Sequence, residues 1–418
     1  MNNMKKVIYL YSDEYSMRDV HRFGADYLMQ QGYDVELWTV YEKNVTRKRS
    51  SDSYYIGDNW KKINKKKFQV YVEDDVCADT VFFVIGGMYK FLPVLLRQKR
   101  DYAYIMVATP VYELDSGALH GNVDGMTRWQ KLKKYITIYG IEYVLGMVSR
   151  QLVDEMWRNS RNRGIYEYIR DNYRKVDNYL IAVANSEGEK VIPDFMRPDA
   201  VKIHSYDYDR YIELERRNLT ESIEHIVFID QGFADLHLDM LDSKEYNAFK
   251  KKDSRELLRK QLNRCFSLLE DYYELPVVIA AHPHVIYQGT FEGRKLVFGK
   301  TEELVKNARF VVMHMSTAVS FVVLYNKPAL VVYNDSFMKM KFGMDIQENC
   351  RLLGYEAVNL DSDRTSIESL NEHIMINKHL YEEYKKRFLM GDNDEYDEKL
   401  VIEVIEKNFL NRREIIDG

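Results

Sequence analysis

Short apolar runs alternate with helical stretches along most of the chain, and this alternation constrains the fold more than any other feature. The first series opens with an apolar run at residues 5–11, a stretch of helical spacing at 17–33 that stops at Gly32, and a second run at 34–41. A strand, a helix and a strand with short links form the β-α-β unit of a parallel sheet. We therefore expect an α/β protein.

A second β-α series begins after a break. Residues 205–222 contain no apolar run, and beyond them strands are expected at HIVFID, PVVIAAH, KLVFG, RFVVMHM and PALVVY. Helices are expected between these strands, including a long one at about 254–272 and another over 366–388. The sequence thus predicts two Rossmann-like doubly wound parallel sheets, with domains at 1–215 and 216–385 and a C-terminal helical tail at 386–418.

Bulk composition narrows the class of protein. A chain of 418 residues suits two domains, and a net charge of −5 disfavours nucleic-acid binding, which needs a basic surface. The three cysteines, Cys77, Cys265 and Cys350, lie far apart and fit a reducing compartment. With no signal peptide and no apolar stretch of membrane-spanning length expected, a cytoplasmic protein is predicted.

The stretch LPVVIAAHPHVIY ends an apolar run in two histidines separated by a proline. Ligands of open α/β sheets bind at the carboxyl ends of strands, and His282 falls at such an end. Pro283 biases His282 toward an extended conformation, which holds the ring in one direction. An imidazole there can donate to a phosphate oxygen or protonate a leaving group near neutral pH. A His-Pro turn without a function is the alternative, and His284 is read as a supporting or exposed residue.

A second candidate segment follows the run RFVVMHM. Ser316 is expected to open a helix as its N-cap, with the amides of Thr317 and Ala318 pointing outward, where helix amino ends bind anions. Capping and phosphate binding use the same groups, so a purely structural role of Ser316 stays open. His314 lies on the same side of the strand as Ser316 by alternation and would then face the crevice too; an inward position is the alternative.

With these two motifs in this order, residues 226–334 resemble the second half of bacterial transferases of nonulosonic and ulosonic acids, such as sialyltransferases and capsular Kdo transferases. Those enzymes have a His-Pro motif and a downstream Ser motif in a GT-B fold, which consists of two Rossmann-like domains facing a central cleft. The region GKTEELVKNARFVVMHMSTAVSFVVLYNKPALVV is also similar to surface-polysaccharide biosynthesis proteins and, more loosely, to teichoic-acid polymerases. The first half shows no comparable motif.

The resemblance implies an inverting, metal-independent glycosyltransferase that moves an acidic sugar from a CMP-linked donor to a capsule or lipopolysaccharide acceptor. His282, with Pro283, would contact the donor phosphate and assist the departure of CMP, while Ser316 and Thr317 would hold that phosphate. Residues 1–215 would bind the acceptor and residues 216–385 the donor. The expected partners are a nucleotide-sugar donor and a glycan or lipid-linked glycan acceptor. No separate cofactor is expected.

Such enzymes also carry an acidic motif whose carboxylate acts as general base on the acceptor hydroxyl, and here the sequence departs from the pattern. The string Asp230-Gln231-Gly232 has the right composition at a strand end, but it lies in the second half. Asp115, in ELDSG after the run YIMVATP, lies in the first half, where an acceptor-side base is expected. We favour Asp115 as base and Asp230 as a hinge or nucleotide contact, although either could be an ordinary loop carboxylate.

Two further sequence patterns are interpreted mainly as ordinary structural features. The D-x-D strings that begin at Asp207, Asp361 and Asp392 lie in polar stretches and are read as solvated loops, so no metal site is predicted. The basic runs at 60–68 and 128–152 contain apolar residues and admit peripheral contact with an anionic inner membrane. A surface loop and an amphipathic helix are the simpler reading of these runs.

Four alternatives stay open at this point. A teichoic-acid-type CDP-polyol phosphotransferase, a UDP-sugar-using GT-B enzyme, an epimerase-like enzyme and a non-catalytic nucleotide-sugar-binding protein share the same outline. The acceptor, the linkage and the sugar are not specified by any motif.

Overall fold

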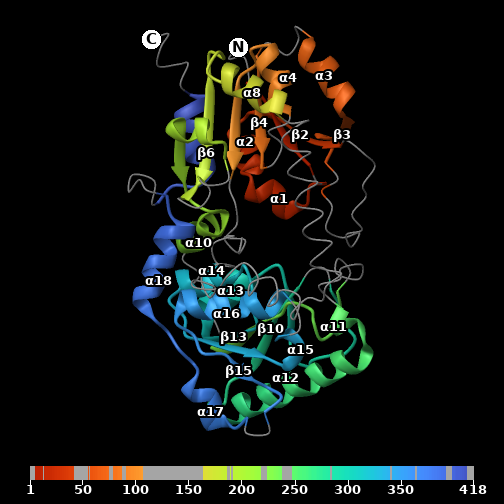
Figure 1. Cartoon of the computed structure of the whole chain (residues 1–418), viewed down its shortest axis with the longest axis vertical. Coiled ribbons are helices and arrows are strands. Elements are labelled where there is room, and N and C mark those ends of the chain that lie inside the picture. Colours follow the sequence, from red (N-terminus) through yellow and green to blue (C-terminus); the bar gives the residue numbers. More distant parts are fainter. Residues whose placement is uncertain are drawn as a thin grey trace, which may run out of the picture.

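The two halves of the chain form two α/β units in this computed structural model (Figure 1). The structure describes residues 5–12, 14–41, 55, 57–74, 79–86, 91–106, 163–185, 189, 192–217, 224–237, 247–282, 285–338, 341–362, 365–391 and 398–411. All structural statements below concern these residues.

The first unit is built on a seven-stranded parallel sheet with the order β3-β2-β1-β4-β5-β6-β7. Its central strands are continuous apolar runs because helices cover both faces of the sheet. The strands are β1 Lys6–Tyr11, β2 Asp34–Tyr41, β3 Trp60–Asn64, β4 Thr80–Ile85, β5 Tyr102–Met106, β6 Tyr179–Ala184 and β7 Ala200–Ile203.

The helices of the first unit are α1 Met17–Arg22, α2 Ala25–Gln30, α3 Lys65–Glu73, α4 Leu92–Arg97, α8 Arg163–Asn172, the 3₁₀ helix η4 Asp194–Asp199 and α10 Tyr206–Arg216. The single helix expected over 17–33 is two short helices. Gly24 divides them by adopting a left-handed conformation with φ of 68°, which an L side chain rarely adopts.

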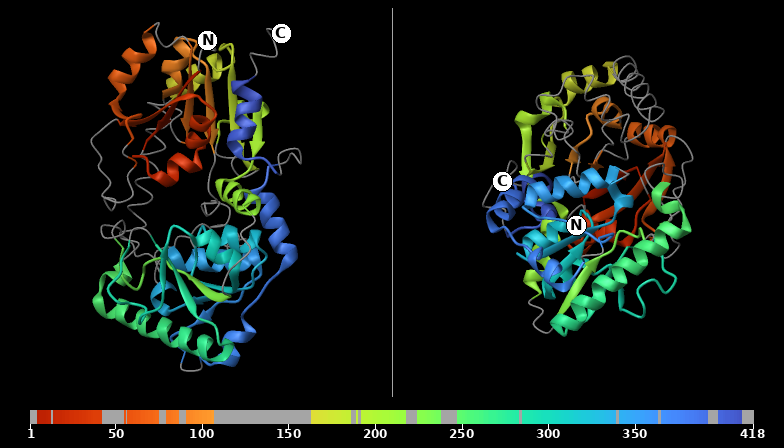
Figure 2. Two further views of the ribbon diagram at one scale, coloured as in Figure 1. Left: turned by 180° about the vertical axis from the view of Figure 1, so that it is seen from behind. Right: turned by 60° about the horizontal axis from the view of Figure 1, so that its bottom comes forward.

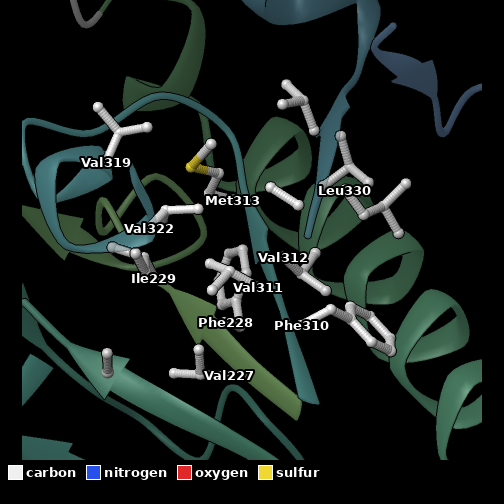
Figure 3. Close-up of a cluster of buried hydrophobic side chains, with 14 of the residues drawn as sticks. Val227, Phe228, Ile229, Phe310, Val311, Val312, Met313, Val319, Val322 and Leu330 are labelled. Carbon is white, nitrogen blue, oxygen red and sulfur yellow. The ribbon is translucent and has the colours of Figure 1, made fainter. Parts of the chain in front are cut away.

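The second unit has a six-stranded sheet with the order β12-β10-β8-β13-β14-β15. These strands are β8 His225–Ile229, β10 Val277–Ala281, β12 Leu296–Phe298, β13 Ala308–Met313, β14 Ala329–Tyr333 and β15 Val358–Asn359. A separate antiparallel pair joins β9 Leu236–His237 to β11 Val285–Ile286. The core of this unit lies where side chains of β8 and β13 meet those of α14 (Figure 3).

The helices of the second unit are α11 Asn247–Lys250, α12 Lys252–Tyr273, α13 Thr301–Asn307, α14 Val319–Leu324, α15 Asp335–Met338, α16 Lys341–Leu353, α17 Ile367–Glu372, α18 Lys378–Tyr384 and the π-helix η7 Lys385–Leu389. The single helix expected over 366–388 is therefore wrong. It is interrupted where Met375 forms an antiparallel bridge with Ala329 at the start of β14, and Asn377 caps the helix that follows.

The C-terminal segment returns to the first unit (Figure 2). Helix α19 Val401–Ile405 and the π-helix η9 Glu406–Leu410 bury Ile402, Ile405 and Phe409 in the core beneath the first sheet. The tail predicted at 386–418 therefore contains helices that belong to the core of the first unit.

The predicted α/β class with two doubly wound parallel sheets is confirmed, since both sheets have the strand order of a Rossmann fold. The predicted boundary at 215/216 falls in the last turn of α10, between the two sheets. No helix in the described part of the chain is both long and apolar enough to span a bilayer.

Candidate functional site

The candidate site lies at the carboxyl edge of the second sheet, where the strand order reverses. The chain builds β8, β10 and β12 in one direction and β13, β14 and β15 in the other, so the switch point lies between β8 and β13. Ala280 of β10 and Met313 of β13 both pair with Ile229 of β8, so the carboxyl ends of the three strands lie side by side at one edge of the sheet. Open α/β sheets bind ligands at this point.

The structure brings the predicted segments of the second half to this edge. His282 follows β10, Asp230 to Gly232 follow β8, and Ser316 follows β13 after a bend. Because β10 and β13 flank β8, their ends lie two strand spacings apart, or about 10 Å. His282 is half-buried and is not sealed in the core. Pro283 and His284 lie outside the described residues.

Asp230 organises the loop that it begins. Its side chain is buried, with one carboxylate oxygen accepting from the amide of Gly232 at 3.0 Å and the other from the hydroxyl of Tyr287 at 2.6 Å. Gly232 has φ of 74°, so glycine suits this turn. Burial raises the pKa of Asp230 to about 6, although the hydrogen bonds from Tyr287 and Gly232 lower it. Gln231 between them is half-buried.

Tyr287 was not among the residues predicted from sequence. Its hydroxyl accepts from the backbone amide of His282 at 2.8 Å and donates to Asp230, and so connects the ends of β10 and β8. Burial, followed by the charge of Asp230, raises the pKa of Tyr287, which stays protonated. A tyrosine in a chain with 33 of them carries no sequence signal, and only the fold gives this one a role.

The Ser316 segment differs from its prediction. Helix α14 begins at Val319 with Ala318 as its N-cap, so Ser316 does not open the helix. Ser316 is buried, and its hydroxyl accepts from the Ala318 amide at 3.1 Å within a turn. Thr317 is exposed. Any ligand would therefore meet turn residues here, because the amides that were expected to point outward are partly used by the turn itself.

His314 takes the inward position that the sequence left open. The chain bends at His314, so strand alternation does not extend to Ser316. The ring is 1% exposed and lies against Phe228, Phe233 and Phe337. Its Nδ1 is 2.6 Å from the carbonyl oxygen of Val332, and burial lowers the pKa of His314 to about 4. The neutral ring therefore donates to Val332 and does not face a crevice.

The first unit, which was predicted to bind the acceptor, is described only in part. Asp115 lies outside the described residues. At the carboxyl edge of the first sheet, after β1, Glu14 pairs with Lys62 at 2.6 Å. The basic run at 60–68 forms β3 and the first turn of α3, where Lys61 also pairs with Glu36 at 2.7 Å. The run at 128–152 lies outside the described part.

The D-x-D string at Asp207 is not the solvated loop that was expected, whereas Asp361 is half-buried in a turn. Asp207 and Asp209 are buried in the first turn of α10, and Asp361 accepts from Gln261 at 2.5 Å and from the amide of Asp335 at 2.6 Å. Buried carboxyls require such partners. Asp363, Asp392 and Asp394 lie outside the described residues, and within the described ranges no group of three His, Cys, Asp or Glu side chains has an arrangement that could hold a metal ion.

Comparisons with known proteins add structural likenesses only. No protein-family model matches the chain, and no curated protein matches it. The wall teichoic acid polymerase TagF (H444N variant) has a TM-score of 0.45 at 10% identity, covering 98% of this chain and 90% of that one. The UDP-N-acetylglucosamine 2-epimerase from Rickettsia bellii scores 0.40 at 11% identity and full coverage of both chains.

The calicheamicin glycosyltransferase CalG4 scores 0.40 at 10% identity, covering 91% of this chain and 92% of that one. At these identities and scores, such likenesses do not assign an activity to this chain.

Proposed function

We propose that the chain is an inverting, metal-independent glycosyltransferase of GT-B architecture that uses a CMP-linked acidic sugar as donor. One observation carries the proposal. The half-buried His282, the Asp230 loop and the Ser316 turn follow three adjacent strands, β10, β8 and β13, at the carboxyl edge beside the switch point of a sheet with Rossmann strand order. That is where such sheets bind nucleotides.

The proposed chemistry is a single displacement. An acceptor oxygen attacks the anomeric carbon while the bond from that carbon to the CMP phosphate oxygen breaks, and a base takes the acceptor proton. His282 donates to the phosphate oxygens as they gain charge, and the Ser316 turn with Thr317 holds the same phosphate. Preorganised donors at the leaving group stabilise the transition state.

The two carboxylates have different proposed roles. Both oxygens of Asp230 already accept hydrogen bonds from its own loop and from Tyr287. Asp230 is therefore proposed to shape the donor site together with Gln231 and Gly232. Asp115 is proposed as the base that acts on the acceptor, which residues 1–215 would bind. The acceptor is proposed to be a surface glycan presented at the inner membrane.

A donor panel tests the proposal. The full chain is incubated with CMP-linked acidic sugars, CDP-polyols and UDP-sugars, with and without EDTA, and nucleotide release is measured. We expect CMP release that EDTA leaves unchanged. His282→Ala should lower it by about 10²–10⁴-fold, the range for a lost proton donor. His379→Ala is the control, since that histidine is exposed on α18.

The other outcomes separate the alternatives. Release of CMP from CDP-polyols alone, with polyol phosphate passing to the acceptor, would identify a phosphotransferase, and UDP release alone would identify a UDP-sugar enzyme or epimerase-like enzyme. Tight nucleotide binding without turnover, unaffected by His282→Ala, would indicate a binding protein. Each of these three results contradicts the proposal.

A further inference from the structure

The hydroxyl of Tyr287 occupies a position that no sequence motif assigns. We propose that Tyr287 is a positioning residue that sets the backbone of His282 against the end of β8, through Asp230. This inference rests on the proposed function for its effect on turnover, but its geometry can be tested without any activity.

The hydroxyl group forms a bridge between two strand ends. It donates to Asp230 at 2.6 Å and accepts from the His282 amide at 2.8 Å. Parallel pairing of β10 with β8 reaches Ala280, whose carbonyl oxygen accepts from the Asp230 amide at 3.2 Å. His282 lies two residues beyond that last pair. The tyrosine bridge therefore extends the connection between the strands to the residue that carries the ring.

Tyr287 is itself held by the loops that it connects. It directly follows β11, which pairs with β9, and β9 ends the loop that starts at Asp230. Its ring packs against Phe291 and Phe298, with centroids 6.0 and 5.8 Å away. The contacts therefore form a closed ring that runs from Asp230 through β9 and β11 to Tyr287 and back to Asp230. Movement of either loop would change the position of His282.

The bridge should respond to the charge of Asp230. As a carboxylate, Asp230 accepts from both Tyr287 and Gly232. A proton on the oxygen that faces Tyr287 turns that oxygen into a donor, so the hydrogen bond reverses or weakens, and a proton on the other oxygen weakens the Gly232 turn. Among the described residues, the other ionisable groups near this carboxylate are Asp235, which raises its pKa, the Arg259 that pairs with Asp235, and the ring of His282, whose amide is bound by Tyr287.

The pH dependence follows from these contacts. Burial raises the pKa of Asp230 to about 6, and the hydrogen bond from Tyr287 lowers it. In the natural chain the hydrogen bond from Tyr287 to Asp230 should be strongest above a pH of about 6, where Asp230 is a carboxylate, and should weaken or reverse on the acid side. In Tyr287→Phe the carboxyl loses a donor, so its titration should move to higher pH and no longer reach His282.

The first measurement is spectroscopic. The full chain is labelled with nitrogen-15 on the backbone of its ten histidines, and the His282 signal is assigned by its loss in His282→Gln. We expect that signal to contain a component that follows Asp230, in addition to any change caused by the His282 ring itself, and we expect Tyr287→Phe to remove only that component. Tyr273→Phe is the matched control, because its hydroxyl donates to Asn371 at 3.0 Å away from this site.

The second measurement is turnover with the donor identified by the nucleotide panel. Tyr287→Phe should lower kcat by about 10- to 100-fold, the effect of leaving partly buried partners unpaired, with little change in KM. It should also shift the acid limb of the pH profile. Tyr273→Phe should leave both unchanged.

The two measurements distinguish a failure of the positioning role of Tyr287 from a failure of the proposed function. A His282 amide that does not titrate, or that titrates equally in Tyr287→Phe, overturns the positioning role even if the chain is an active transferase. A titrating amide in a chain without transferase activity keeps the positioning role and rejects the proposed function.

Discussion

A histidine directly after a parallel strand can turn toward a crevice or back into the core, and its neighbours decide which. At His314 three phenylalanine rings and the carbonyl group of Val332 surround the imidazole, and its Nε2 is buried without a hydrogen-bond partner among the described residues. At His282 the side chain stays half-buried, while its amide is engaged by Tyr287. The same residue type therefore has opposite surroundings at two strand ends of one sheet.

The buried state of His314 predicts a loss of stability in acid. Its pKa is about 4 in the folded chain, against 6.5 for the exposed ring, so the unfolded chain binds the proton first. The free energy of unfolding should therefore fall as pH decreases from 6.5 toward 4, by about 3 kcal/mol at most.

Urea denaturation across this pH range measures that loss. His314→Gln keeps an N–H group for Val332 but does not titrate, so it should flatten the dependence. Equal slopes in the natural chain and in His314→Gln would mean that the ring is not buried in its neutral form.

Some helices depart from the local sequence pattern because a tertiary contact determines where they begin or end. Residues 17–33 have helical spacing, yet the helix breaks at Gly24. A Cβ atom built there would lie 2.4 Å from the Cβ of Ile402 in the returning C-terminal segment. The break therefore serves a contact with a residue far along the chain, which helical periodicity cannot report.

Two glycine substitutions separate backbone strain from this contact. Gly24 and Gly32 both have positive φ, but no atom lies within 4 Å of a Cβ at Gly32. Gly32→Ala should cost only the left-handed strain, about 1–2 kcal/mol. Gly24→Ala should cost a further 1–3 kcal/mol or so from overpacking. The free energies of unfolding in urea give the difference, and equal costs would show that Ile402 does not constrain Gly24.

At the scale of the whole molecule, α10 lies between the two units (Figure 1), and its charged side chains contact both of them. Arg210 on α10 pairs with Glu302 of α13 at 2.5 Å and with Glu213 at 2.6 Å. Glu213 also meets Nε2 of His21 of α1 at 2.9 Å, and Nδ1 of that ring lies 2.6 Å from Asp26. A cavity of about 240 Å³ beside this network is lined by residues of α1, α2, α10 and the C-terminal segment.

The network predicts a loss of stability in alkali. Hydrogen bonds to Asp26 and then Glu213 raise the pKa of His21 from 6.5 to about 9. A raised pKa means that the stabilisation is complete below pH 6.5 and disappears as pH rises through about 9. His21 is one-third exposed, so solvent reduces the effect.

Thermal unfolding between pH 6 and 10 checks this expectation. His21→Gln should lower the melting temperature at the acid end of the range and converge with the natural chain at the alkaline end. The exposed His379 supplies the control, since His379→Gln should leave the curve unchanged. A constant difference between His21→Gln and the natural chain at every pH would contradict a charged His21.

Local sequence was sufficient for the class of fold, the presence of a doubly wound parallel sheet in each half and the position of His282 at a strand end, because buried parallel strands are continuous apolar runs. It was not sufficient for the helix breaks at Gly24 and Met375, for the burial of His314 and Asp209, or for the bridge made by Tyr287. Each of these depends on atoms distant in sequence: Ile402 for Gly24, Ala329 for Met375, the Val332 carbonyl oxygen for His314, the Val401 amide for Asp209 and Asp230 for Tyr287. The periodicity of the sequence indicates which residues are buried, whereas the tertiary packing determines which neighbours they contact.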